Sequence, residues 1–172
     1  MNPQLHCIFS RRSIRSFSPE AIPEALLTDL LQAGMAAPSA AGKDPWHFLV
    51  LRERTTLDQL AELLPNGKML KQATAALIAC GDLHQAHDQE LSFLLQDVSA
   101  AVENILLAAN ILGLGACWLG IHPRTERVGA VARRFNLPEH IIPVAGIALG
   151  WPIKPEEPRT RYAPQRVHLE QW

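Results

Sequence analysis

The sequence is poor in cysteine, and its cysteines are not arranged in pairs. The 172 residues include three, Cys7, Cys80 and Cys117, an odd number spread along the chain without a CxxC pair. A disulfide framework needs paired cysteines, so we expect buried free thiols in a reducing compartment. Neither end carries a signal peptide, a transit peptide or a lipidation motif. Together these absences favour a cytoplasmic protein.

The chain also lacks an excess of charge of either sign. Its formal net charge is −1, with 19% charged and 48% hydrophobic residues. We therefore expect neither nucleic acid nor a membrane as a partner, and any anion site must be local. The apolar content and the absence of internal repeats favour a single domain over residues 1–172 with a real core.

The motifs of several common enzyme classes are missing as well. We find no GxxxxGK[ST] phosphate loop, no GxSxG elbow and no HExxH pair. The Gly113-Leu114-Gly115 segment lacks the third glycine of a dinucleotide fingerprint and follows an expected helix, whereas the fingerprint follows a strand. Classical hydrolase and kinase chemistry therefore has no support in the sequence.

The longest apolar segment runs from Leu91 to Gly115. Its apolar residues recur at steps of three and four, which predicts a helix of roughly 22 residues and about 33 Å. Polar residues interrupt the run too often for a membrane span, so we expect a soluble helix. Past Ala101 almost no polar face remains, and part of the cover for this half could come from a second copy of the chain. The interrupting residues are Gln96, Asp97, Glu103 and Asn104.

Shorter patterns predict the remaining elements. A helix signalled by Pro23-Glu24 should stop near Ala37-Pro38, and Thr55 and Thr56 should cap a second helix. A third helix is expected over 124–135. Four apolar runs have strand length, and strands separated by helices could form a parallel α/β sheet. These runs are 46–51, 74–80, 116–121 and 141–149.

Three arginines lie within five residues of one another, at Arg11, Arg12 and Arg15, and they bracket Ser13. Guanidinium groups are planar donors that suit a phosphate. A solvated basic surface explains the same residues, and the segment alone leaves both interpretations open.

Two histidines, His84 and His87, form an HxxH pattern in the polar stretch from Asp82 to Glu90. Histidines at this spacing could share a metal ion. No third ligand lies nearby in sequence, so the pattern favours a solvated loop.

Five segments, in this order and at this spacing, resemble the FMN-dependent nitroreductase family. The resemblance implies an α+β fold, a mostly antiparallel sheet flanked by helices, which would replace the parallel sheet considered above. It also implies an intertwined homodimer with two flavins at the interface, in which residues 152–172 form a C-terminal arm that packs on the partner. The segments are RRSIRSF at 11–17, APSA and PWHF within 37–48, LGLGACWLG at 112–120, LPEHIIPVAGIALGWP at 137–152 and PRTRY at 158–162.

The resemblance also implies residues that bind the phosphate of FMN. Arg11, Arg12 and Ser13 would hold the flavin from one subunit, with arginine on the phosphate. Arg159 and Arg161 match the basic pair near the C-terminus that closes on the same group.

A second set of residues would surround the flavin ring. Arg15 would lie near the pyrimidine edge and Lys68 near O2, while the backbone N–H groups of Leu119 and Gly120 would approach N5 and O4. Pro38, Ser39 and Ala40 resemble the loop that the partner subunit lays against the ring.

One segment departs from the family pattern. Where members commonly read PSxxNxQPW, this chain has Gly42, Lys43 and Asp44 in place of the asparagine and of the residues that follow it. A side-chain hydrogen bond near the flavin would be lost, and Lys43 would add a positive charge at the mouth of the site. The short stretch between Cys80 and Leu91 leaves little room for a lid, so we expect an open cleft.

The function implied by the resemblance is hydride transfer from NADH or NADPH, through FMN, to a small-molecule acceptor such as a nitroaromatic or a quinone, with ping-pong kinetics. No protein side chain need act as acid or base, so we expect no catalytic residue. Two alternatives remain open. One is a flavin-binding or storage protein with little turnover, and the other is a specialised reductase for dehalogenation or flavin breakdown.

Overall fold

The core of the molecule is a four-stranded antiparallel sheet. A computed structural model describes residues 2–154 and 156–172, with strands β1 (Trp46–Leu51), β2 (Ala75–Asp82), β3 (Gly115–Gly120) and β4 (Ile141–Gly150). The strand order is β1-β2-β4-β3, and each neighbouring pair is antiparallel. This confirms the α+β class and shows that the parallel sheet was wrong.

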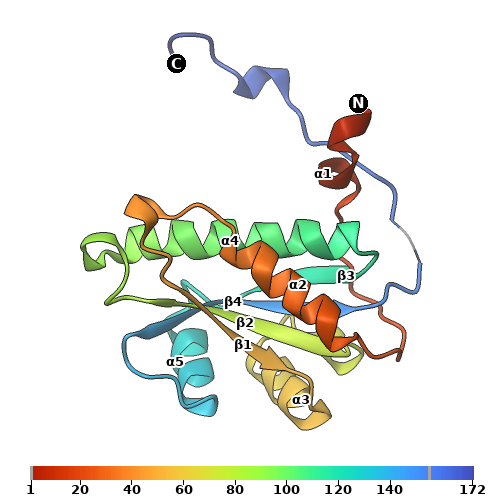
Figure 1. Cartoon of the computed structure of the whole chain (residues 1–172), viewed down its shortest axis with the longest axis vertical. Coiled ribbons are helices and arrows are strands. Elements are labelled where there is room, and N and C mark those ends of the chain that lie inside the picture. The colour runs from red at the N-terminus through yellow and green to blue at the C-terminus, as the bar shows by residue number, and fades with distance from the viewer. Residues whose placement is uncertain (1, 155) are drawn as a thin grey trace.

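Two layers of helices cover the sheet (Figure 1). Helices α2 (Glu24–Met35) and α4 (Leu91–Ile111) pack on one face, and α3 (Arg54–Leu63) and α5 (Thr125–Arg134) on the other. Alternate residues of β2 supply the two cores: Leu77 faces the α4 side, while Ile78 faces the α3 side. All eight residues of β2 are therefore buried, which explains its continuous apolar sequence.

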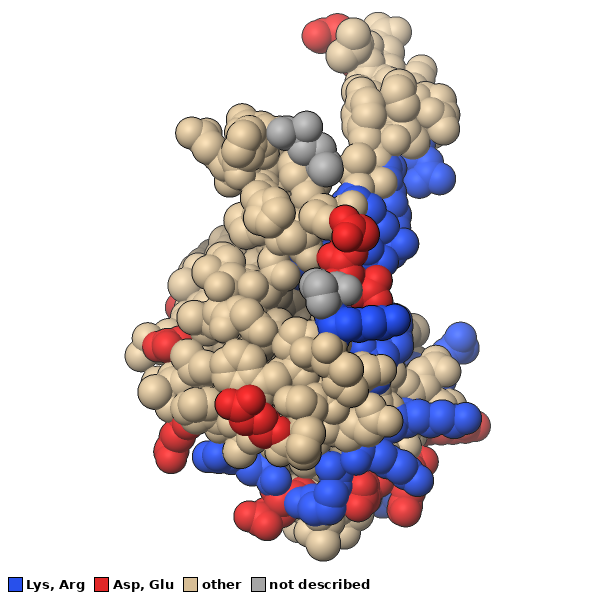
Figure 2. Space-filling view, turned by 90° about the vertical axis from the view of Figure 1, so that its right-hand side faces the viewer, with Lys and Arg blue, Asp and Glu red and all other residues tan. Residues whose placement is uncertain are grey.

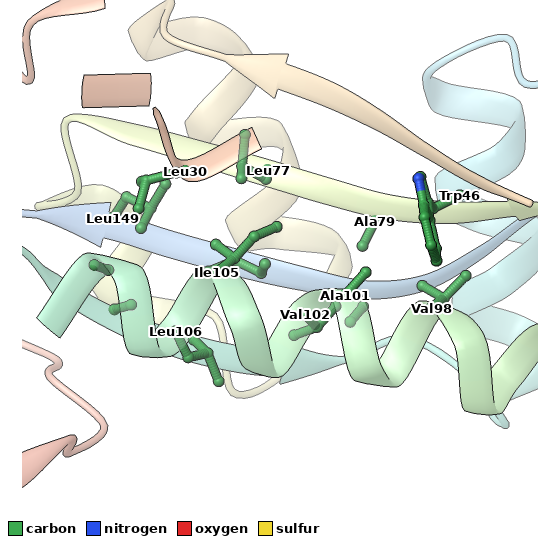
Figure 3. Packing of buried hydrophobic residues seen from close by; sticks show 14 of the residues in the cluster. Leu30, Trp46, Leu77, Ala79, Val98, Ala101, Val102, Ile105, Leu106 and Leu149 are labelled. Carbon is green, nitrogen blue, oxygen red and sulfur yellow. The ribbon is translucent and has the colours of Figure 1, made fainter. Parts of the chain in front are cut away.

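The helix predicted over Leu91 to Gly115 is confirmed as α4. Figure 3 shows Val98, Val102 and Ile105 directed at the sheet, where they belong to the same core as Trp46 and Leu77. Truncation of a fully buried residue of this kind to alanine costs about 2–5 kcal/mol. By length and composition α4 could cross a membrane, with a mean hydropathy of 1.4. Its packing is that of the core helix of a globular domain.

The other face of α4 keeps apolar side chains near the surface. Ile111 is 66% exposed and Leu91 37% exposed, while Leu95 and Leu107 are only half-buried. Such a stripe is typical of a surface that another element or another copy covers.

Some element boundaries differ from the predictions. Helix α2 begins at Glu24 after Pro23, as expected, but ends at Met35, two residues early. Thr55 and Thr56 do not cap α3, because the helix already begins at Arg54 and its N-cap residue is Glu53. The hydroxyl of Thr56 instead donates to the carbonyl of Glu53 at 2.8 Å.

The residues after β4 form an extended arm that leaves the body beside the N-terminus (Figure 1). The backbone N–H of Arg159 donates to the carbonyl of Phe9 at 3.0 Å, while Leu169 and Trp172 at the tip are 85% and 101% exposed.

Short helices complete the described chain. They are η1 (Pro3–Leu5), α1 (His6–Ser10), η2 (Ala40–Gly42), η3 (Lys68–Lys71), η4 (His87–Gln89) and η5 (Pro164–Arg166).

Candidate functional site

The arginine-rich segment lies alongside the start of β3. Ser13 forms a parallel bridge with Ala116, and the backbone N–H of Ile14 donates to the carbonyl of Ala116 at 2.9 Å. Gly115 makes this approach possible, because a Cβ there would lie 2.7 Å from Cγ2 of Ile14. The glycine therefore fixes how closely the segment can follow the strand.

This segment and the C-terminal arm form a hollow that we call the basic pocket. Its volume is about 130 Å³. Figure 2 shows Lys and Arg side chains gathered along the edge where the arm leaves the body. The structure thus brings together five of the predicted residues, from opposite ends of the chain. The lining residues are Ile8, Arg11, Arg12, Ser13, Arg159 and Arg161.

The guanidinium groups in the basic pocket repel one another. Arg12, and then Arg161, lower the pKa of Arg159 below its ordinary value. Cations held this close are stabilised by an anion that several of them share, which is the arrangement that a phosphate needs.

Acidic groups already contact two of these arginines. Arg11 Nε lies 3.2 Å from Glu103 Oε1 on α4, and Arg12 Nη2 lies 3.5 Å from Glu156 Oε2. Arg12 also donates to the backbone carbonyl of Glu157. Among the described residues, Arg161 forms no ion pair, so its charge is available to a ligand.

A second hollow, which we call the β3 cleft, opens on the same segment. Its volume is about 560 Å³, and it collects four further predicted residues: Arg15, Lys68, Leu119 and Gly120. Ser13 and Arg15 are two residues apart, which is about 7 Å of extended chain. The basic pocket and the β3 cleft are therefore neighbours along one segment.

Sequence reasoning missed several residues that line the β3 cleft. Pro65 and Asn66 shortly precede Lys68, and this position was a usable signal. Trp118 alternates with buried neighbours on β3, and it is 36% exposed. Met69 and Cys117 complete the lining.

The cysteine in the cleft is not poised as a nucleophile. Burial raises the pKa of the Cys117 thiol, and the nearby charge of Arg15 offsets this only in part. The thiol is therefore protonated at neutral pH, and the nucleophilic form is the thiolate.

The predicted ring-contacting loop lies elsewhere in the protomer. The backbone N–H of Ala40 donates to Asp97 Oδ1 at 2.9 Å, in the first half of α4. At the other end of α4, Asn110 Nδ2 donates to Ser10 Oγ at 2.8 Å, next to the arginine segment. Asp97 and Asn110 are 13 residues apart, which is roughly 20 Å along a helix. One protomer therefore does not bring residues 38–40 to the basic pocket.

Asp44, which replaces a family glutamine, has a local structural role. Its Oδ1 accepts a hydrogen bond from Ser39 Oγ at 2.5 Å, and its own N–H donates to that hydroxyl at 3.0 Å. Ala41, Gly42 and Asp44 all have positive φ between 50° and 63°. The substituted residues thus close a tight turn that starts at Ser39.

The two histidines of the HxxH pattern do not share a site. His87 Nε2 lies 3.4 Å from Asp88 Oδ2, and its ring meets Phe93 edge-on. His84 instead stacks on His140, with the ring centroids 4.5 Å apart.

The fold is α+β with an antiparallel sheet, and its basic pocket lies beside the β3 cleft. This combination suits a protein that binds a phosphate-bearing ligand. The model of the nitroreductase family matches residues 8–66 and 58–151. A candidate NADH dehydrogenase/NAD(P)H nitroreductase of Methanothermobacter thermautotrophicus is 44% identical over 168 residues, which span 98% of this chain and 87% of the relative. The chain belongs to the nitroreductase family.

Solved structures agree with this assignment. A candidate NADH dehydrogenase/NAD(P)H nitroreductase from Parabacteroides distasonis superposes with a TM-score of 0.93 at 36% identity, and each chain is covered completely. A candidate nitroreductase from Desulfovibrio desulfuricans in complex with FMN superposes with a TM-score of 0.85 at 31% identity, covering 100% of this chain and 99% of that one.

Proposed function

We propose that this protein is a homodimeric flavoenzyme that transfers reducing equivalents from NADH or NADPH to a nitroaromatic, a quinone or a similar small acceptor, with ping-pong kinetics. It is an NAD(P)H-dependent oxidoreductase of the nitroreductase type, and its cofactor is FMN. The observation that carries the proposal is the convergence of Arg12, Arg159 and Arg161 on one pocket that adjoins the β3 cleft.

The residues present fit FMN. Arg12, Ser13, Arg159 and Arg161 would hold its phosphate, because charge-assisted hydrogen bonds of this kind contribute about 1.5–3 kcal/mol each. The mutual repulsion that lowers the pKa of Arg159 would be relieved by that phosphate. Arg11 lines the same pocket and is oriented by Glu103.

The β3 cleft would receive the ring. In the part of the chain that the structure describes, β3 is an edge strand of the sheet, so backbone N–H groups on its outer side have no partner strand beyond the bridge at Ala116. Ala116 faces outward, and so does Gly120 by the alternation along the strand, so the N–H of Gly120 would donate to the ring. The N–H of Leu119, predicted to do the same, points toward β4, where Leu119 is paired with Gly146. Arg15 and Lys68 in the same cleft would supply positive charge beside it.

When bound, FMN supplies the hydride and electron transfer between the nicotinamide and the acceptor. The cations of Arg15 and Lys68 would stabilise the negative charge that develops in the cleft during reduction. Cys117 would remain protonated, and the proposed reaction needs no proton transfer by a side chain.

A second copy of the chain would complete the site. Residues 38–40 lie roughly 20 Å along α4 from the basic pocket, and in the proposed dimer the partner's loop would contact the ring. The half-exposed apolar stripe of α4 and the exposed end of the arm would be covered in the same dimer.

Anaerobic spectroscopy of the purified protein tests the proposal. The bound flavin should lose its colour with NADH or NADPH and regain it when a quinone or a nitroaromatic is added. If neither nicotinamide bleaches the flavin, or if no acceptor restores the colour, the proposed oxidoreductase function is wrong.

One observation favours a second candidate, a flavin-holding protein with little turnover. The hydroxyl of Ser39 is engaged by Asp44 at 2.5 Å, so the loop has one donor fewer with which to orient a substrate. This candidate predicts a yellow protein that remains unreactive in the same experiment.

A further inference from the structure

Three potential metal ligands meet at the sheet end where β2 finishes and β4 begins. Asp82 is the last residue of β2, His84 follows two residues later, and His140 directly precedes β4. One ligand atom from each lies within 4.8 Å of the other two. The cluster joins residues that are far apart in sequence, which explains why the HxxH pattern showed no third ligand.

The backbone holds this cluster in place. Asp82 is paired with Ile141 in the antiparallel register, so the residue before Ile141 falls beside it. The N–H of Leu83 donates to the carbonyl of His140 at 2.9 Å, and the N–H of His84 donates to Asp82 Oδ1 at 2.8 Å. The three side chains therefore converge because of the sheet register and the turn that follows it.

The carboxylate of Asp82 lacks a cation. The residue is only 7% exposed, yet no lysine, arginine or histidine forms an ion pair with it among the described residues. Burying an unpaired carboxylate is costly, and buried charges are normally paired or bound to metal. Neither imidazole forms a hydrogen bond or an ion pair with it among the described residues, although their ligand atoms lie within 4.8 Å of its carboxylate, close enough for one small cation to contact all three.

We propose that Asp82, His84 and His140 bind a divalent transition-metal ion of the Zn²⁺ type. Two imidazoles and one carboxylate are a common ligand set for such ions, with further positions left to water. Ligation requires the His84 ring to turn out of its stack on His140, so that its lone pair points at the ion. His84 is exposed, so the ring has room to turn.

The ion would bind at the base of the loop that contains residues 38–44. The N–H of Asp82 donates to the carbonyl of Pro45 at 2.7 Å. Beside the cluster lies a hollow of about 520 Å³, lined by Ala41, Lys43 and the residues from His84 to Gln89. A bound ion would join β2, β4 and this loop, and would do so whether or not flavin is present.

The test is a Zn²⁺ titration of the flavin-loaded, chelator-treated full chain, followed by calorimetry, with a Co²⁺ absorption spectrum to report the ligands. One ion per chain should bind. His84→Ala and His140→Ala should weaken binding by more than the about 10–100-fold that loss of a mere supporting partner costs. His87→Ala is the matched control, because this nearby histidine lies outside the cluster, and it should bind Zn²⁺ as the parent does.

Thermal unfolding gives an independent measurement. Zn²⁺ should raise the Tm of the parent and of His87→Ala, but not that of His84→Ala. Equal binding by the parent and His84→Ala, or an equal loss in His87→Ala, overturns the proposal. Because His84 is exposed, its replacement should leave the protein folded and its flavin content unchanged, so the result does not depend on the proposed enzyme function.

Discussion

Asp97 Oδ1 accepts a hydrogen bond of 2.9 Å from the backbone N–H of Ala40, 57 residues earlier in the chain. Asp97 is only 5% exposed, and among the described residues its second oxygen, Oδ2, has no hydrogen-bond partner. This bond ties the loop that contains Ser39 to the central helix α4. This buried carboxylate therefore helps to fix the position of the loop.

Replacing this carboxylate should destabilise the protein. In Asp97→Ala the N–H of Ala40 loses its acceptor, and the free energy of unfolding should fall by about 1–3 kcal/mol. Asp97→Asn keeps an acceptor oxygen and should lose less. Urea unfolding of the two variants measures the difference. Equal losses in both variants would show that the hydrogen bond to Ala40 does not account for the lost stability.

Arginine substitutions in the basic pocket should release flavin. Removing one charge-assisted hydrogen bond in Arg12→Ala or Arg161→Ala should weaken FMN binding by roughly ten- to a hundredfold. Arg134→Ala on the exposed side of α5 is a control that removes the same charge elsewhere. Titration of apo-protein with FMN, followed by flavin fluorescence, gives the dissociation constants. Unchanged constants for Arg12→Ala and Arg161→Ala would contradict the phosphate assignment.

Two glycines on β3 should respond differently to the same substitution. A Cβ at Gly120 meets no atom within 4 Å, so Gly120→Ala should keep its stability within about 0.5 kcal/mol and yet bind flavin more weakly, because the methyl group would crowd the ring. In Gly115→Ala the Cβ would lie 2.7 Å from Ile14, so both stability and flavin binding should fall. Urea unfolding of the apo-proteins and flavin titration separate the two effects. Full flavin affinity in Gly120→Ala would argue against a ring in the β3 cleft.

The long helix and the strand positions could be predicted because apolar spacing is local information. Apolar residues at steps of three and four identify α4, and the run over 46–51 coincides with β1. The direction of the strands could not be read from the same pattern. All eight residues of β2 are buried on a sheet covered by helices on both faces, so the sequence shows no alternation that would separate parallel from antiparallel pairing. The antiparallel direction of the strands was predicted instead from the resemblance to the nitroreductase family.

Without the family resemblance, which also predicted Arg159 and Arg161, the sequence predicts the site only where its residues are neighbours along the chain. The cluster of Arg11, Arg12, Ser13 and Arg15 is visible in the sequence itself. The hydrogen bond from Arg159 to Phe9 is not, because it depends on how the C-terminal arm folds back onto the N-terminal segment. Likewise, His140 meets Asp82 only because β2 and β4 are paired in one register. The cap of α3 was missed because Glu53, an unusual N-cap residue, precedes the threonines.

The buried thiol of Cys80 should make the protein less stable at alkaline pH. Burial raises its pKa from the ordinary 9.0 to about 12. Between these values the thiol ionises in the unfolded chain but not in the folded one, so unfolding releases a proton. The free energy of unfolding should therefore fall with rising pH, by up to about 1.4 kcal/mol per unit, from its full value below pH 9. Cys117, whose pKa is also raised, should act in the same direction.

Denaturant unfolding at several pH values above 9 measures this slope. Cys80→Ala should have a shallower slope than the parent, whatever its stability at neutral pH. Identical slopes in the two proteins would show that Cys80 does not titrate as described.

Removing the end of the arm should affect assembly more than folding. The described backbone hydrogen bonds of residues 164–172 all lie within the arm itself, and Leu169 and Trp172 are exposed. A chain that ends at Ala163 should therefore keep the unfolding transition of a protomer, while its dimer dissociates at higher concentration than the parent dimer. Sedimentation at several concentrations gives the two dissociation constants. An unchanged dimer would exclude a swapped arm as its source of stability.

The bonds at Asp97 and at Asn110 lie on one uninterrupted helix, so the register between them depends on residue count alone. A single inserted residue between them would rotate one end by about 100° and shift it by about 1.5 Å, which would misalign the loop of one protomer with the pocket of the other in the proposed dimer. The connection over residues 87–90 lies beyond His84 and the turn that holds it, and it has no such constraint, since lengthening a surface loop costs little. Evolutionary insertions and deletions should accordingly accumulate in that connection and spare this part of α4.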